Sequence, residues 1–581
     1  MSHTPRVLAA VKGWGPLLAL AVATVAGGLT LFRAEAQPPT IDLDSARADL
    51  TVYGDDAGDV SAWSLAAGDI NGDGTDDLII GAYRGDPAGG TDAGETYVIY
   101  GAESLPATID FSTARADLTV YGDDAYDYSG WSVAAGDING DTTDDLIISA
   151  CRGDPAGGTD AGETYVIYGG ESLPPAIDLD SARADLTVYG DDAYDYSGWS
   201  VAAGDIDGDT TDDLIIGAHG ADPAGGTDAG ETYVIYGGDS LPATIDLSSA
   251  RAGLTVYGDG EGDASGQAVA VGDLNGDTTD DLIVGAPGAD PAGGTDAGQT
   301  YVVYGGGGLP AAIDLDSARA DLTVHGPDAG DYSGSSVAAR DVDGDTTDDL
   351  IIGAHKADGP GRGSTCGAGQ VGDRCDAGET YVLHGASSLP GTIDLSSSSA
   401  DLTVYGADAA DYSGYSVAVG DIDGDAAGDL IIGAYHADPP GDTDAGETYV
   451  VYGSRGLPAT IDLSSAGAGL TIYGGEAGDG SGFSVASGDI DGDTTDDLLT
   501  GAPGAAPSGR GSAGETYVIH GGPAGPMGRV GGSPDTDETP PEPAGSSGPS
   551  VGLLAGLAAA ATTALVALIA GAWYARRRWR R

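Results

Sequence analysis

A short acidic segment recurs along the chain and carries residue types from which a cation site can be built. In its first copy, residues 68–82 read GDINGDGTDDLIIGA, so that Asp69, Asn71, Asp73 and Asp77 occupy the first, third, fifth and ninth positions of a tight loop. Ca²⁺ takes about six to eight oxygen ligands, and alternating side chains together with one backbone carbonyl, that of Thr75, can converge on it. The intervening glycines let the backbone fold over the ion. The spacing therefore predicts a calcium-binding loop.

Six further copies of this segment follow before residue 503. An Asp- and Gly-rich turn that merely stays solvated is the alternative, but the repeated spacing favours about seven Ca²⁺ sites. The predicted ligands are Asp69, Asn71, Asp73, Thr75, Asp77, Asp137, Asn139, Asp141, Thr143, Asp145, Asp205, Asp207, Asp209, Thr211, Asp213, Asp273, Asn275, Asp277, Thr279, Asp281, Asp341, Asp343, Asp345, Thr347, Asp349, Asp421, Asp423, Asp425, Ala427, Asp429, Asp489, Asp491, Asp493, Thr495 and Asp497.

The segments that flank each loop are strand candidates. The EF-hand does not fit, because its loop needs a glutamate where this one has Ile80, and it needs flanking helices. Here the flanks, WSLAA and DLIIGA, are short, rich in β-branched or small residues and bounded by glycine. We therefore expect each loop to be the tip of a β-hairpin.

The loops recur with a fixed period. Their first aspartates lie 68 residues apart, except for one step of 80 between Asp341 and Asp421. Each unit offers four short strands, similar to ADLTVYG, WSVAAGD, DDLIIGA and ETYVIYG, as in a propeller blade. The first unit begins with ADLTVYG and the last ends without it, so the N-terminal copy should complete the last blade and close the ring. An open solenoid would need atypical end repeats. The predicted fold is an all-β, seven-bladed β-propeller with WSVAA as the innermost strand.

These repeats resemble a known family. GDLNGDTTDDLIVGAP at 272–287 and GDIDGDTTDDLLTGAP at 488–503 are similar to FG-GAP repeats, which build the seven-bladed propeller of integrin α subunits. The chain departs from the pattern where serine replaces the phenylalanine of the FG pair and where most copies lack the proline of GAP. The resemblance implies calcium in the hairpin loops and a ligand-binding face at the opposite end of the ring.

Residues outside the repeats predict export and anchoring. Residues 1–36 combine basic residues, an apolar run and an Ala-x-Ala site, as in a secretory signal peptide, with an uncleaved anchor as the alternative. The propeller spans 37–523, and a Pro-, Gly- and Ser-rich stalk spans 524–550. Residues 551–574 lack charge and are long enough for a transmembrane helix, and the basic tail, 575–581, should stay cytoplasmic. A C-terminal sorting signal is an alternative, although no sorting motif precedes the span.

The charge narrows the possible partners. The formal net charge is −70, with 92 acidic residues, and such a field repels phosphate backbones, so we expect no nucleic-acid binding. A saline habitat and ordinary solubility explain this acidity equally well.

Two features fall on the expected ligand face. Cys366 and Cys375 lie in the longer fifth unit and should form a disulfide in an exported protein. Exposed tyrosines supply apolar area with a polar tip, which suits protein or sugar ligands, although packing over the ring explains them equally well. The candidates are Tyr126, Tyr128, Tyr194, Tyr196, Tyr332 and Tyr412.

The motifs favour binding over catalysis. The chain lacks G-x-S-x-G, H-E-x-x-H and a phosphate-binding loop, and no nucleophile neighbours the histidines in sequence. We therefore expect a non-enzymatic cell-surface protein for adhesion or recognition of an extracellular protein or glycan. A structural envelope component and an enzyme on a propeller scaffold are the alternatives.

Overall fold

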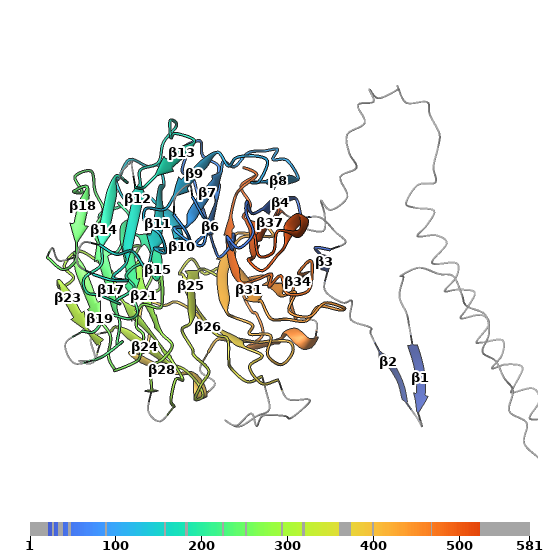
Figure 1. Ribbon diagram of the computed structural model, residues 1–581. Helices are drawn as coiled ribbons and strands as arrows, with labels where there is room; N and C mark the ends of the chain where they lie inside the picture. Colours follow the sequence, from blue (N-terminus) through green and yellow to red (C-terminus); the bar gives the residue numbers. More distant parts are fainter. Residues whose placement is uncertain are drawn as a thin grey trace, which may run out of the picture. The chain divides into compact units, whose positions relative to one another are not determined.

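The computed structural model describes residues 39–522, apart from 45–47, 88–89, 156–157, 181–183, 224–225, 250–251, 292–293, 316–319, 360–373, 398–399 and 466, together with the backbone of 21–25 and 28–32 (Figure 1). The chain divides into Met1–Val530 and Gly531–Arg581. The predicted stalk, transmembrane segment and basic tail, most of the predicted signal peptide, and Cys366 lie outside the described residues. In the described part, no helix has the length and apolar character needed to cross a membrane.

Seven antiparallel sheets form the described domain, and each gains a fifth, parallel strand at its outer edge. Named from the inner to the outer strand, the first blade consists of β5 (Ser64–Gly68), β6 (Asp77–Ala82), β7 (Glu95–Ile99), β9 (Leu118–Tyr121) and β13 (Ala176–Asp178); the second of β10 (Ser129–Gly136), β11 (Asp145–Ala150), β12 (Glu163–Ile167), β14 (Leu186–Tyr189) and β18 (Thr244–Asp246). The third blade consists of β15 (Ser200–Gly204), β16 (Asp213–Ala218), β17 (Glu231–Ile235), β19 (Leu254–Tyr257) and β23 (Ala312–Asp314); the fourth of β20 (Ala268–Gly272), β21 (Asp281–Ala286), β22 (Gln299–Val303), β24 (Leu322–His325) and β28 (Thr392–Asp394); the fifth of β25 (Ser336–Arg340), β26 (Asp349–Ala354), β27 (Glu379–Leu383), β29 (Leu402–Tyr405) and β33 (Thr460–Asp462). The sixth blade consists of β30 (Ser416–Gly420), β31 (Asp429–Ala434), β32 (Glu447–Val451), β34 (Leu470–Tyr473) and β3 (Thr40–Asp42); the seventh of β35 (Ser484–Gly488), β36 (Asp497–Ala502), β37 (Glu515–Ile519), β4 (Leu50–Tyr53) and β8 (Thr108–Asp110).

A few short elements complete the described structure. A separate hairpin pairs β1 (Ala21–Val25) with β2 (Gly28–Phe32). Three 3₁₀ turns, η3 (Leu395–Ser397), η4 (Leu463–Ser465) and η5 (Pro507–Gly509), lie in connections.

The fifth strand of each blade is absent from the sequence-based prediction. It is a three-residue segment such as Ala176–Asp178, which runs parallel to β9 and pairs with Thr119 to Tyr121. Three residues are too short to show a hydrophobic period, so this strand forms only because the preceding blade offers an open edge. It covers the outer edge of the fourth strand.

The prediction that the N-terminus closes the ring is confirmed. Strand β4 pairs antiparallel with β37 and completes the seventh blade. Strand β3, which precedes β4 in the chain, completes the outer edge of the sixth blade, because it pairs parallel with β34. The start of the domain is therefore hydrogen-bonded to its last two blades, which Figure 1 shows as the blue strands beside the orange ones.

The hydrophobic core lies between the blades. One cluster fills each of the seven interfaces; that between the first two blades contains Ile79 and Val98 from one sheet and Leu146 and Ile148 from the next. The second and third strands are buried on both faces, which explains their continuous apolar sequences. Stacking of sheets therefore fixes the positions of the loops at either end of the ring.

Candidate metal loops and an aromatic face

Each acidic segment joins the first strand of a blade to the second, as predicted. In the first blade, the loop is closed by its own carboxylates: Asp69 accepts hydrogen bonds from the backbone N–H groups of Asp73 (2.9 Å) and Gly74 (2.8 Å). Asp77, the first residue of β6, is fully buried and accepts from the N–H groups of Asn71 (3.0 Å) and Gly101 (2.9 Å). These bonds hold the first and ninth positions on the inside of the turn.

The residue at the third position divides the loops into two kinds. Where it is aspartate, three carboxylates converge, with one ligand atom from each within 4.8 Å of the others. These groups are Asp205, Asp207 and Asp213; Asp341, Asp343 and Asp349; Asp421, Asp423 and Asp425; and Asp489, Asp491 and Asp493. In the other three loops the residue is asparagine, and its side-chain amide donates to the ninth aspartate, as Asn71 does to Asp77 at 3.0 Å.

Two buried oxygens show that these loops fit a cation. Oδ1 of Asp343 and Oδ1 of Asp423 are buried without a hydrogen-bond partner. Burial also raises the pKa of Asp349 to about 6 and that of Asp429 to about 7, because a carboxylate removed from water is costly when charged. A divalent ion would supply the missing partner, so the clusters are consistent with calcium-binding loops.

An aspartate outside the predicted ligand set connects neighbouring loops around the ring. The residue at the eighth position accepts a hydrogen bond from the first aspartate of the preceding loop, as Asp144 does from the N–H of Asp69 (2.9 Å). The same bond occurs in five other interfaces, including the closing one between Asp76 and Asp489. In the sixth repeat this residue is Gly428. Beside it, Arg340 forms an ion pair with Asp496 at 2.7 Å.

At the opposite end of the ring, aromatic side chains surround the central channel. Five neighbouring blades each contribute an aromatic ring at the start of the inner strand. Trp131 lies within β10, and the other four residues directly precede their strands. Consecutive ring centroids lie 4.4–5.1 Å apart. The order around the channel is Trp199, Trp131, Trp63, Phe483 and Tyr415. Gln267 and Ser335 occupy this position in the remaining two blades and line the same cavity of about 310 Å³. We refer to these seven residues as the channel-mouth ring.

Sequence analysis missed this ring as a site. Its signal is present, because Trp63, Trp131 and Trp199 are spaced 68 residues apart. However, only the closure of seven blades brings these side chains around one axis.

The six predicted tyrosines separate into two classes. All six adopt positive φ, a strained conformation for a bulky residue. Tyr126 and Tyr194 differ from the others in being 57% and 56% exposed, at a position where four repeats have glycine. Tyr128, Tyr196, Tyr332 and Tyr412 are partly buried and extend the channel-mouth ring outward through contacts such as that of Tyr196 with Trp199. Three cations lie over tyrosines at the rim: Arg84 over Tyr83, Arg152 over Tyr128 and Lys356 over Tyr332.

The fold also brings a histidine and a serine together at the channel mouth. Ser335 Oγ and His355 Nδ1 lie 2.8 Å apart, a pairing that their separation in sequence conceals. Burial lowers the pKa of His355 to about 4, so this imidazole is neutral. The His355 ring otherwise contacts the rings of Tyr332, Tyr412 and Tyr415.

The cysteines also differ in state. Cys375 is disulfide-bonded, and Cys151 is free and buried, with the pKa of its thiol raised by burial. The predicted partner of Cys375, Cys366, is not among the described residues, so the pairing of these two cysteines stays a prediction.

Comparison with protein families assigns the repeats. The FG-GAP repeat model matches residues 61–99, 129–167, 197–235, 265–303, 413–451 and 481–519, each of which runs from the channel mouth through the metal loop to the third strand. The chain is an FG-GAP repeat protein. The fifth repeat, which carries the insertion, is the one without a match.

Similar proteins include phospholipases and integrin α subunits. Phosphatidylinositol-glycan-specific phospholipase D is 30% identical in Dictyostelium discoideum over 218 residues (36% of this chain and 23% of that protein) and 30% identical in Homo sapiens over 229 residues (39% and 26%). Integrin alpha-PS2 of Drosophila melanogaster is 30% identical over 238 residues (40% and 15%). The chain thus spans about a quarter or less of the length of these relatives.

Proposed function

We propose that this FG-GAP protein is a cell-surface recognition module whose metal loops stabilise the ring and whose aromatic face binds an extracellular protein or glycan. The observation that supports this most is the channel-mouth ring. Stacked aromatic side chains supply large apolar area at low entropic cost and stack well on protein or sugar surfaces. These side chains line an open cavity of about 310 Å³, and exposed apolar surface of this kind often marks a binding site.

The strained tyrosines add to this proposal. A bulky residue at positive φ costs about 1–3 kcal/mol, persists only where the surrounding structure holds it, and such residues cluster at functional sites. Tyr126 and Tyr194 adopt this conformation in two neighbouring repeats, although four other repeats have glycine at the same position. Both rings extend into solvent. We propose them as contacts at the edge of the aromatic face.

We propose binding rather than catalysis. The relatives include an enzyme by name, the phospholipase D, and the Ser335 and His355 pair is the feature of this chain that would favour hydrolysis. A serine nucleophile needs its base to be oriented by a third group, whereas the described surroundings of His355 are aromatic rings. Labelling of Ser335 by a fluorophosphonate reagent, abolished in Ser335→Ala, would contradict this.

To test recognition, two tryptophans of the channel-mouth ring are replaced by glutamine, which the fourth blade carries at the equivalent position. Full-length protein is screened in calcium against arrays of glycans and of extracellular matrix proteins, and the hits are compared with the double variant Trp131→Gln and Trp199→Gln, because glutamine occupies this position as Gln267. We expect binding to weaken at least about tenfold, since each aromatic contact contributes roughly 1 kcal/mol or more. Unchanged binding to every hit would place the interaction elsewhere, and self-association alone would favour a structural envelope role.

A further inference from the structure

The seventh metal loop has a neighbour that most of the other loops lack. The residue that follows the third strand is histidine in two repeats, His384 and His520, and tyrosine in the other five, namely Tyr100, Tyr168, Tyr236, Tyr304 and Tyr452. His520 Nδ1 lies 3.1 Å from Oδ2 of Asp491, the third residue of its loop. The corresponding distance from His384 to Asp343 is 3.5 Å. An imidazole therefore reaches into the seventh loop.

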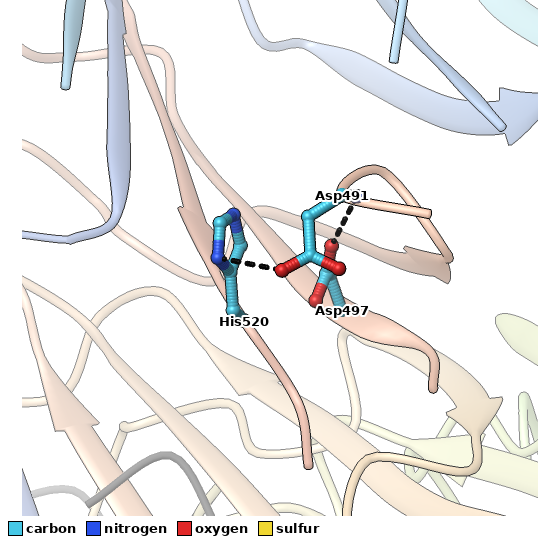
Figure 2. Close-up of side chains that lie close together, drawn as sticks. All are labelled: Asp491, Asp497 and His520. Atoms are coloured by element: carbon cyan, nitrogen blue, oxygen red, sulfur yellow. Dashed lines mark hydrogen bonds and ion pairs between the residues drawn. The ribbon is translucent and has the colours of Figure 1, made fainter. Parts of the chain in front are cut away.

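Figure 2 shows His520, Asp491 and Asp497 converging on one point. Each presents a ligand atom within 4.8 Å of the other two. Asp497 is 1% exposed and Asp491 is 9% exposed, so the carboxylates are shielded from water. Nε2 of His520 is also buried and has no hydrogen-bond partner. A buried polar nitrogen without a partner is costly, so hydrogen bonds within the protein do not fully account for this imidazole.

The donor set differs from that of an oxygen-only loop. Imidazole nitrogen is a ligand for zinc, copper, nickel and iron, whereas Ca²⁺ and Mg²⁺ prefer oxygen. Two ligands at about 2.0–2.2 Å from one tetrahedral Zn²⁺ ion lie roughly 3.3–3.6 Å apart, so the present 3.1 Å between Nδ1 and Oδ2 needs to widen only slightly to admit the ion.

We propose that the seventh loop is a transition-metal site, which binds an ion of the Zn²⁺ class through His520, Asp491 and Asp497, while the loops flanked by tyrosine take Ca²⁺. The proposal depends on the loops being metal sites and is independent of what the aromatic face binds. It gives the closing blade of the ring a metal preference of its own.

The test measures metal binding by the full-length chain with His384→Tyr, which gives the fifth repeat the common tyrosine. In millimolar calcium, Zn²⁺ is titrated by calorimetry, and Co²⁺ is titrated by its visible absorption. We expect one site that His520→Tyr removes or weakens at least about tenfold, because the variant loses one of three protein ligands. Asp491→Asn, the residue that three other loops carry at this position, should weaken the site in the same way while leaving the loop backbone intact.

A control variant separates this site from an unrelated histidine. His436 Nδ1 lies 2.9 Å from Asp444 on the opposite face, and His436→Gly introduces the residue found in three other repeats. Zinc binding should be unchanged in this variant. Equal zinc isotherms for the parent and His520→Tyr, or loss of zinc binding in His436→Gly instead, would overturn the proposal. The calcium stoichiometry of the same samples tests the other loops separately.

Discussion

Several carboxyl groups beneath the aromatic face are buried, which disfavours their charged form. The third strand begins with glutamate in six repeats and with Gln299 in the fourth. Glu163 accepts a hydrogen bond from the Tyr165 hydroxyl, and burial raises its pKa to about 7. Burial and the nearby Glu163 raise the pKa of Asp127 to about 8. These groups release protons at higher pH in the folded chain than in the unfolded chain.

Replacing Glu163 with glutamine should therefore reduce the pH dependence of stability. Because the folded pKa lies above the unfolded value of 4.5, the contribution of Glu163 is fully present below about pH 4.5 and is lost as pH rises through about 7. We expect Glu163→Gln to be more stable than the parent at pH 8, on the order of 3 kcal/mol, and to gain little near pH 4.5. Melting curves at both pH values, with excess calcium, measure this.

The fourth repeat supplies the precedent for this variant. Gln299 there accepts the hydrogen bond of the Tyr301 hydroxyl in the same way. The pH argument would be wrong if Glu163→Gln and the parent lost the same stability between the two pH values.

Among the elements, strand β4 pairs with the strand that lies farthest from it along the chain. Leu50 in β4 is buried in the cluster between the seventh and first blades, although β37, to which β4 pairs, lies more than four hundred residues later. Leu118 in β9 is its counterpart in the first blade, where the neighbouring strand β7 lies only about twenty residues earlier in the chain. The two strands differ in chain connection but not in packing.

This comparison gives a test of ring closure. We expect Leu50→Ala and Leu118→Ala to destabilise the propeller to a similar extent, by about 2–5 kcal/mol, because each leaves a cavity in an equivalent core. Denaturant unfolding of the two variants side by side measures this. A much smaller loss for Leu50→Ala would indicate that the N-terminal strand is held loosely and that the ring opens there before it unfolds.

At the scale of the whole molecule, the metal loops form one connected ring at one end of the propeller. The eighth-position aspartates link neighbouring loops, and the formal net charge of −70 opposes the compact state. Bound divalent ions would relieve repulsion within each loop and lower this charge.

Removal of calcium should consequently destabilise the entire ring. For a Kd of about 10⁻⁴–10⁻³ M, 10 mM calcium contributes about 1–3 kcal/mol at each site. We expect a calorimetric stoichiometry near seven, or near six if zinc occupies the seventh loop, and a large fall in melting temperature in chelator. Magnesium is the control ion, since its smaller, octahedral shell suits such loops poorly. Little binding and an unchanged melt would mean that the aspartates form only solvated turns.

The sequence alone determined the repeat, the number of blades, the acidic hairpin loops and the identity of the closing strand. These features follow from local spacing: the acids of one loop lie within nine residues of each other, and the apolar segments beside them have the length of strands. The buried carboxylates of Asp343 and Asp423 lie where that spacing puts them.

Only the tertiary structure decided which distant residues meet. The channel-mouth ring, the bond from Asp69 to Asp144, the Ser335 and His355 pair, and the approach of His520 to Asp491 all join residues from different blades or different strands. The three-residue fifth strands likewise depend on an edge offered by another repeat. The contacts within one blade arise when strands pair in one sheet, and those between blades arise when seven sheets close around one axis. In both cases the fold fixes a distance that separation along the chain does not reveal.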